Sequence, residues 1–232
     1  MKIAFQKNKP WRDAFLVANC YRWESVPDFI EEENCIVNRK SDGIATGFEN
    51  ASLILKEPFT GDTHISVDCA FEAWGAPLIV ITESLEQDVQ GRYRYREYYE
   101  VVLYEEGINV WRLTTDRQNN VSWKKLMSVD FPVTACDIHT LTVDIVGDTL
   151  EITACDRKMS LFLPDLFKSY YIGIDACENI NRFYAMEATP IRKQEGHIFS
   201  CSFCGYRHTG ETPPTKCPDC GVGPEKFILL EA

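Results

Sequence analysis

The sequence has neither a long apolar segment nor an excess of basic residues. No stretch approaches the roughly 20 apolar residues of a membrane-spanning helix, and the apolar run Ile3–Phe5 is too short for a signal peptide. With 24 Lys and Arg against 35 Asp and Glu, the formal net charge is −11, which disfavours nucleic acid and anionic membranes as partners. We therefore expect a cytoplasmic protein whose acidity serves solubility or favours a partner with a basic surface.

Several catalytic motifs are also absent. The chain contains no Gly-x-Gly-x-x-Gly, no Gly-Lys-Ser/Thr and no Gly-x-Ser-x-Gly, which removes nucleotide, flavin and serine-hydrolase functions. Histidine is scarce, and His64 and His139 fall in strand patterns, where histidine is usually a hydrogen-bonded structural residue. A non-enzymatic role is favoured, and the sequence leaves enzyme activity open.

Cysteine, by contrast, is abundant, and four of the ten cysteines form two Cys-x-x-Cys-Gly motifs, Cys201-Ser-Phe-Cys204-Gly205 and Cys217-Pro-Asp-Cys220-Gly221. Two such pairs can close a tetrahedral site on one metal ion. A glycine after each pair allows the positive φ that turns backbone amides toward a thiolate. Redox-active pairs or disulfides are the alternative, but no βαβ pattern surrounds these motifs. The spacing itself suits a zinc ribbon and an iron centre equally well.

The other six cysteines show no ligand spacing. In a cytoplasmic protein they are expected to be reduced and mostly buried. They are Cys20, Cys35, Cys69, Cys136, Cys155 and Cys177.

The residues around the two motifs extend the pattern. The segments His197–Tyr206, Gly210–Pro214 and Cys217–Phe227 closely resemble the rubredoxin-like domain at the C-terminus of rubrerythrins. The resemblance implies one iron ion that cycles between ferric and ferrous states, with Cys201, Cys204, Cys217 and Cys220 as its ligands. It also implies aromatic packing around the site by Phe199, Tyr206 and Phe227. Zinc is the alternative occupant.

One departure from rubrerythrins limits what the resemblance implies. Rubrerythrins carry Glu-x-x-His motifs in a helical di-iron bundle, and this chain contains none. The peroxidase function therefore does not carry over, and only the rubredoxin-like module does.

The rest of the chain has a β pattern. Short apolar runs alternate with turn residues, and the clearest is the alternation over 140–145, which Gly147-Asp148 separates from a second alternating run over 150–154. About a dozen such strands without intervening helices predict a large antiparallel β-sandwich, or jelly roll. We expect a long polar loop over 83–96 and at most a short helix over 164–169. The predicted domains are 1–190 for the sandwich and 191–232 for the metal-binding tail, which is too small to fold without its metal.

The order of these segments resembles the concanavalin-A-like lectin and glucanase jelly roll. The segments that carry the resemblance are Asn50–Lys56, Tyr99–Tyr104, Asn109–Trp111, His139–Val143 and Tyr171–Ile174 with Phe183. The resemblance implies two large curved sheets, with carbohydrate binding or cleavage on the concave face.

Four residues are candidates for carbohydrate binding: Trp74, Arg92, Trp111 and Trp123. Tryptophan supplies a stacking platform for a sugar, and Arg92 begins a basic Arg-Tyr-Arg-Tyr-Arg run. The alternative is that the tryptophans pack in the core and the basic run is a solvated loop. Cleavage requires two carboxylates across the glycosidic bond. Glu97 and Glu100 are three residues apart, on opposite faces of a strand, and cannot form that pair.

Three functions follow from the sequence. The first is electron transfer by the tail with a redox partner protein. The second is saccharide binding or another interaction by the sandwich, with the tail as a structural zinc ribbon. The third is a carbohydrate-active enzyme. The sequence does not predict the oligomeric state.

Overall fold

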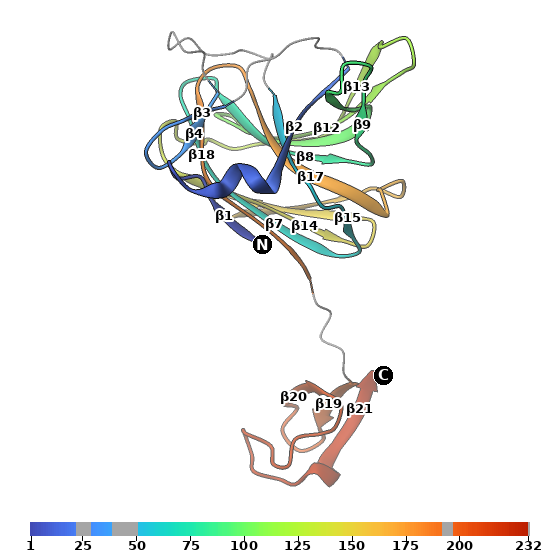
Figure 1. The fold of residues 1–232 in the computed structure, drawn as a ribbon. Helices are drawn as coiled ribbons and strands as arrows, with labels where there is room; N and C mark the ends of the chain where they lie inside the picture. Colours follow the sequence, from blue (N-terminus) through green and yellow to red (C-terminus); the bar gives the residue numbers. More distant parts are fainter. Residues whose placement is uncertain (22–28, 39–50, 192–196, 232) are drawn as a thin grey trace. The chain divides into compact units, whose positions relative to one another are not determined.

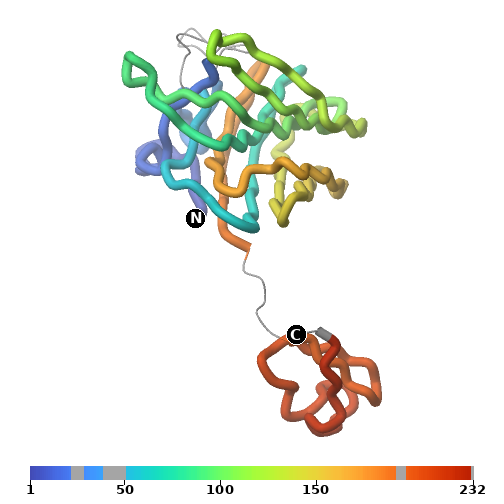
Figure 2. The backbone as a smooth tube through the Cα atoms, turned by 90° about the vertical axis from the view of Figure 1, so that its right-hand side faces the viewer, coloured from blue at the N-terminus to red at the C-terminus, as the bar shows by residue number. Residues whose placement is uncertain are grey.

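The computed structural model describes residues 1–21, 29–38, 51–191 and 197–231. The chain divides into two compact units, Met1–Pro190 and Ile191–Ala232. The first unit consists of two large sheets that lie face to face, and the second contains a small three-stranded sheet (Figures 1 and 2). None of the helical segments in the described residues is long and apolar enough to cross a membrane.

The first sheet, sheet A, has the order β16-β15-β14-β7-β18-β4-β3, with β1 also paired to β18. Its strands are β1 (Lys2–Ala4), β3 (Ile30–Glu31), β4 (Ile36–Val37), β7 (Thr63–Phe71), β14 (His139–Val146), β15 (Thr149–Ala154), β16 (Arg157–Phe162) and β18 (Asn181–Pro190). The pairing of Val146 with Thr149 confirms the turn predicted at Gly147-Asp148.

The second sheet, sheet B, has the order β13-β12-β11-β8-β17-β5-β2-β10-β9, with β6 paired to β17. Its strands are β2 (Phe15–Cys20), β5 (Ser52–Leu55), β6 (Phe59–Thr60), β8 (Ala76–Thr82), β9 (Glu86–Gln87), β10 (Tyr93–Tyr95), β11 (Glu97–Tyr104), β12 (Gly107–Thr115), β13 (Val121–Asp130) and β17 (Ser169–Cys177). Strand β10 runs parallel to β2, whereas the neighbouring pairs in the sheet are antiparallel.

The main hydrophobic core lies between the two sheets. Alternate residues supply it, such as Leu141, Val143 and Ile145 from β14 and Val101 and Leu103 from β11. A second apolar cluster covers the opposite face of sheet B. Both faces of the central strand β8 are thus buried, which explains why its sequence is apolar from Ala76 to Ile81.

Two sequence predictions about the sandwich need correction. The segment 83–96 is not one loop, because β9 and β10 lie within it and join the edge of sheet B. No helix forms over 164–169, since the helical segments of the described residues are the short 3-10 turns η1 (Pro10–Ala14) and η2 (Pro224–Lys226). The predicted jelly roll is otherwise confirmed.

The second unit has the strand order β20-β19-β21. Its strands are β19 (His197–Cys201), β20 (Arg207–Gly210) and β21 (Phe227–Glu231). Its buried hydrophobic residues, among those described, are Phe199, Cys201 and Cys217.

Candidate functional sites

The four C-terminal cysteines converge. Their Sγ atoms all lie within 4.8 Å of one another. The distance from Cys201 Sγ to Cys220 Sγ is 3.7 Å, and that from Cys204 Sγ to Cys217 Sγ is 3.5 Å. A tetrahedron with metal–sulfur bonds of about 2.3 Å has edges of about 3.8 Å, so the four sulfurs fit one metal ion. They are much too far apart for disulfides, and all ten cysteines are free.

Each Cys-x-x-Cys-Gly motif forms the same tight loop. Gly205 donates its N–H to the carbonyl of Cys201, and Gly221 does the same to Cys217, both at 2.8 Å. The two glycines have φ of +81° and +74°, which confirms the predicted need for a residue without Cβ. The first cysteine of each loop is buried, whereas Cys204 is exposed.

Backbone amides point at the sulfurs, as a metal–thiolate centre requires. Burial opposes ionisation of Cys201, but N–H groups of Cys204 and Phe203 donate to its sulfur and lower its pKa to about 7. Tyr206 donates its N–H to Cys204, yet burial and hydrogen bonds with the neighbouring thiols raise the pKa of Cys204 to about 12. A cation bound between the four sulfurs would favour their thiolate forms.

The three candidate tryptophans lie outside the main core, although Trp111 packs against the second apolar cluster. Trp74, in the turn between β7 and β8, is 69% exposed and has φ of +64°. Trp123 on β13 is 48% exposed, and its ring meets that of the half-buried Trp111 edge-on, at 6.4 Å between centroids. Lys125 Nζ lies 4.9 Å from the centroid of Trp111. The structure thus brings Trp111 and Trp123 together, and neither ring forms part of the main core.

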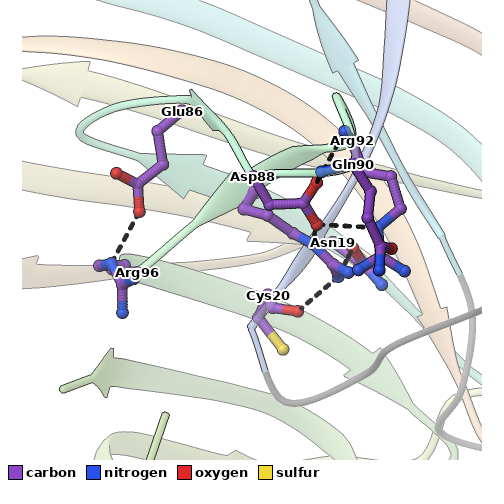
Figure 3. Close-up of polar contacts among 8 residues, drawn as sticks. Asn19, Cys20, Glu86, Asp88, Gln90, Arg92 and Arg96 are labelled. Carbon is purple, nitrogen blue, oxygen red and sulfur yellow. Dashed lines mark hydrogen bonds and ion pairs between the residues drawn. The ribbon is translucent and has the colours of Figure 1, made fainter. Parts of the chain in front are cut away.

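The fourth candidate, Arg92, lies in an ion-pair network within its own hairpin (Figure 3). Its Nε lies 2.8 Å from Asp88 Oδ2, and the buried Arg94 approaches the same oxygen at 3.0 Å. Burial raises the pKa of Asp88. Hydrogen bonds from the N–H of Arg92 and from the guanidinium groups of Arg92 and Arg94 outweigh this effect and hold the pKa well below the usual range. Arg96 pairs with Glu86 and lies over the ring of Tyr21. Most of the basic run therefore stabilises the β9–β10 hairpin.

A polar group that sequence reasoning missed lies on the second face of sheet B. Glu100 is paired across strands with Trp111 and Val80, and so shares their face. Asp175 is paired with Leu78, two residues from Val80, and therefore lies on this face as well. Glu97 lies on the opposite face, where it binds Arg112, as its spacing from Glu100 predicts.

Asp175 is held by a hydrogen-bonded chain. Ser52 Oγ donates to Asp175 Oδ2 at 2.5 Å, and its oxygen lies 2.6 Å from the hydroxyl of Tyr95. Because Ser52 has a single hydroxyl proton, Tyr95 is the donor to Ser52. The carboxyl group of the half-buried Glu100 forms no hydrogen bond with another described residue, and burial, aided by Asp175, raises its pKa to about 8. An acidic residue within the apolar run Tyr171–Ala176 was the one available signal for this pair.

The two units resemble different known proteins. Residues 199–228 match the rubrerythrin, rubredoxin-like domain family. Over 33 residues the chain is 57% identical to reverse rubrerythrin-1 of Clostridium acetobutylicum. The aligned segment makes up 14% of this chain and 18% of that protein. The chain thus spans less than a fifth of the curated relative it matches, and the likeness is confined to the metal-binding tail.

The sandwich resembles glycoside hydrolases in fold. A glycoside hydrolase family 16 endo-glucanase from Bacteroides ovatus aligns over 82% of this chain and 99% of its own, with a TM-score of 0.55 and 8% identity. A β-porphyranase from Bacteroides plebeius aligns over 78% and 87%, with a TM-score of 0.48 and 10% identity. At such identity the first likeness shows the fold alone. The chain thus joins a jelly-roll domain with a glycoside hydrolase-like fold to a rubredoxin-like metal-binding domain of the rubrerythrin type.

Proposed function

We propose that the C-terminal domain binds one iron ion through Cys201, Cys204, Cys217 and Cys220 and transfers single electrons. The observation that carries the proposal is the convergence of the four Sγ atoms within 4.8 Å. The match of 199–228 to the rubrerythrin domain favours iron over zinc. Iron bound by four thiolates supplies a one-electron couple between ferric and ferrous states.

The residues around the four sulfurs would set the potential of such a centre and the side from which a partner could approach it. Amide hydrogens that donate to sulfur stabilise thiolate charge, and such hydrogen bonds are a main determinant of the potential of iron–thiolate sites. Cys204 is exposed and Phe203, beside it, is 75% exposed, so this edge is the accessible side of the centre. A redox partner with a basic surface would suit the net charge of −11. The ten free thiols suit a reducing compartment, and we include the cytoplasm in this proposal.

Metal analysis with visible absorption spectroscopy tests this function. The protein should be purified without oxygen from iron-supplied cells, because zinc competes well for thiolate sites. We expect one iron per chain and a colour that dithionite bleaches and air restores. The Cys217→Ser variant should lose this spectrum. A colourless wild-type protein with one zinc per chain would refute electron transfer and leave the tail as a structural zinc ribbon.

We further propose that the sandwich binds a saccharide at Trp111 and Trp123. The observation that favours this function is an aromatic pair, the exposed Trp123 and the half-buried Trp111, on the same face of sheet B as Glu100. Sugar rings stack on tryptophan, while carboxyl groups bind hydroxyls. The fold shared with an endo-glucanase is compatible with such a ligand.

Glycan-array screening followed by calorimetric titration tests saccharide binding. Trp123→Ala should weaken binding of any saccharide found, because Trp123 is the more exposed ring of the pair. Trp74→Ala is the matched control, since Trp74 is also exposed, at 69% against 48% for Trp123, but lies in the turn between β7 and β8 and away from this pair. Loss of binding in neither variant, or in both, would contradict this site. Turnover of a bound glycoside would instead support the enzymatic alternative.

A further inference from the structure

Three thiols of the sandwich lie at one end of sheet A. Cys69 on β7 is the cross-strand partner of His139 on β14 and is fully buried. Cys155 lies in the turn between β15 and β16, and Cys136 precedes β14, where its N–H binds the carbonyl of Phe71. Cys136 and Cys155 are both exposed. The expectation of mostly buried cysteines is therefore wrong for these two.

The imidazole of His139 is oriented by its surroundings. Its Nε2 lies 2.7 Å from the carbonyl oxygen of Thr134. A carbonyl can only accept, so Nε2 carries a hydrogen. The ring also stacks on Phe71, with centroids 6.0 Å apart. In the neutral ring, Nδ1 is therefore the acceptor.

That acceptor faces a thiol. Cys155 Sγ lies 3.5 Å from His139 Nδ1, a normal distance for a hydrogen bond to sulfur. Because Nδ1 is the free acceptor, the Cys155 thiol donates to it. In the alternative protonation state the imidazolium donates to a thiolate. Burial and the neighbouring Asp156 raise the pKa of Cys155, so the resting thiol depends on the imidazole to accept its proton.

The turn itself does not account for a cysteine at this position. Ala154 pairs with Arg157, so Cys155 and Asp156 form a two-residue turn, with φ of +48° and +60°. Turns with two positive φ values normally contain Asn-Gly or Asp-Gly. The backbone conformation of the turn does not favour cysteine, but this position places the thiol of Cys155 beside the imidazole of His139.

We propose that Cys155 is a reactive thiol, activated by His139, that exchanges with low-molecular-weight disulfides. The proton of Cys155 moves to His139 Nδ1, and Sγ attacks one sulfur of the disulfide. A new disulfide forms between Cys155 and that sulfur while the original S–S bond breaks. The departing thiolate takes the proton from Nδ1, so one disulfide and one thiol give one mixed disulfide and one thiol.

The neighbouring cysteines provide internal controls. Cys136 is exposed but its thiol has no hydrogen-bonded imidazole among the described residues. Cys69 is inaccessible, and burial raises its pKa. If accessibility alone determined reactivity, Cys136 and Cys155 would react equally fast.

The test treats the full-length, metal-loaded protein with bis(2-hydroxyethyl) disulfide and follows each thiol by mass spectrometry. Cleavage after Glu151 places Cys136 and Cys155 on separate peptides. We expect Cys155 to react at least about tenfold faster than Cys136, and His139→Gln to remove that advantage while Cys136 keeps its rate. Equal wild-type rates, or an unchanged Cys155 rate in His139→Gln, would overturn the proposal.

A second variant separates a base from a structural support. In His139→Gly the ring is missing, and added imidazole can occupy its place beside Cys155. Restored reactivity at Cys155 alone supports proton transfer to the ring. Absence of any restoration, with Cys136 now reacting faster than in the wild type, would show that His139 only holds the turn and would overturn the proposal.

Discussion

At the residue scale, Glu100 shows how strongly one carboxyl depends on its surroundings. Its cross-strand partners on sheet B are the aromatic Trp111 and the apolar Val80, and the nearby charge is that of another carboxyl, Asp175. Burial is the main reason that its pKa rises from 4.5 to about 8, and Asp175 adds to the effect. Such a carboxyl is protonated at neutral pH and can donate a hydrogen bond to a ligand hydroxyl.

This pKa predicts how the Glu100→Gln substitution changes stability. Because the folded pKa is the higher one, the folded state binds more protons than the unfolded state between about pH 4.5 and 8. As the pH rises through this range, the free energy of unfolding of the wild type should therefore fall relative to that of the variant, by up to about 1.4 kcal/mol per pH unit. Urea unfolding of both proteins at pH 5 and pH 8, followed by tryptophan fluorescence, measures the difference. Glu106→Gln, at an exposed position, controls for the loss of one carboxylate, and a pH-independent difference for Glu100→Gln would contradict the prediction.

At the element scale, the β11–β12 hairpin depends on a single glycine. Tyr104 pairs with Gly107, so Glu105 and Glu106 form the turn. Gly107 has φ of +134°, and a Cβ there would lie 2.1 Å from the carbonyl oxygen of Val129 on the neighbouring strand β13. Backbone cannot move aside as a flexible side chain would, so both the conformation and the contact exclude alanine.

We expect Gly107→Ala to lower the free energy of unfolding by roughly 2–4 kcal/mol. Gly91→Ala is the matched comparison, because Gly91 has φ of +75° but no atom within 4 Å of the position that a Cβ would take. That variant should cost only about 1 kcal/mol, from the backbone conformation alone. Denaturant midpoints of the two variants measure the difference, and equal losses would show that the contact with β13 relaxes freely.

Elements also show what the sequence could predict. The hairpins and the cysteine loops were predictable because both depend on residues close together in the chain, through alternation and through the Cys-x-x-Cys-Gly spacing. That Glu100 and Asp175 share one face of sheet B was not predictable, since it depends on β8 lying between β11 and β17. The Cys155–His139 contact likewise requires β14 and β15 to pair in one particular register. Periodicity gives the face of a residue within its strand, but not which strand is its neighbour.

At the scale of the whole molecule, the two units depend on different sources of stability. The sandwich has an extensive apolar core between two sheets. The tail buries few hydrophobic side chains among its described residues, and two of these, Cys201 and Cys217, are predicted metal ligands. A domain this small rarely folds on apolar burial alone, so metal binding, worth about 10 kcal/mol or more in comparable four-ligand sites, would be its main source of stability.

Metal removal should therefore unfold residues 191–232 and leave residues 1–190 folded. All five tryptophans precede residue 190, so tryptophan fluorescence reports on the sandwich alone. After treatment with a chelator, the fluorescence melting temperature should stay constant, while hydrogen exchange over 197–231 loses its protection. Cys217→Ala should reproduce this result without a chelator, because it removes one ligand from the buried side of the site. Retained protection in the metal-free tail would show that its fold does not depend on the four sulfurs sharing a cation, whereas a lower melting temperature would show that the sandwich depends on the tail.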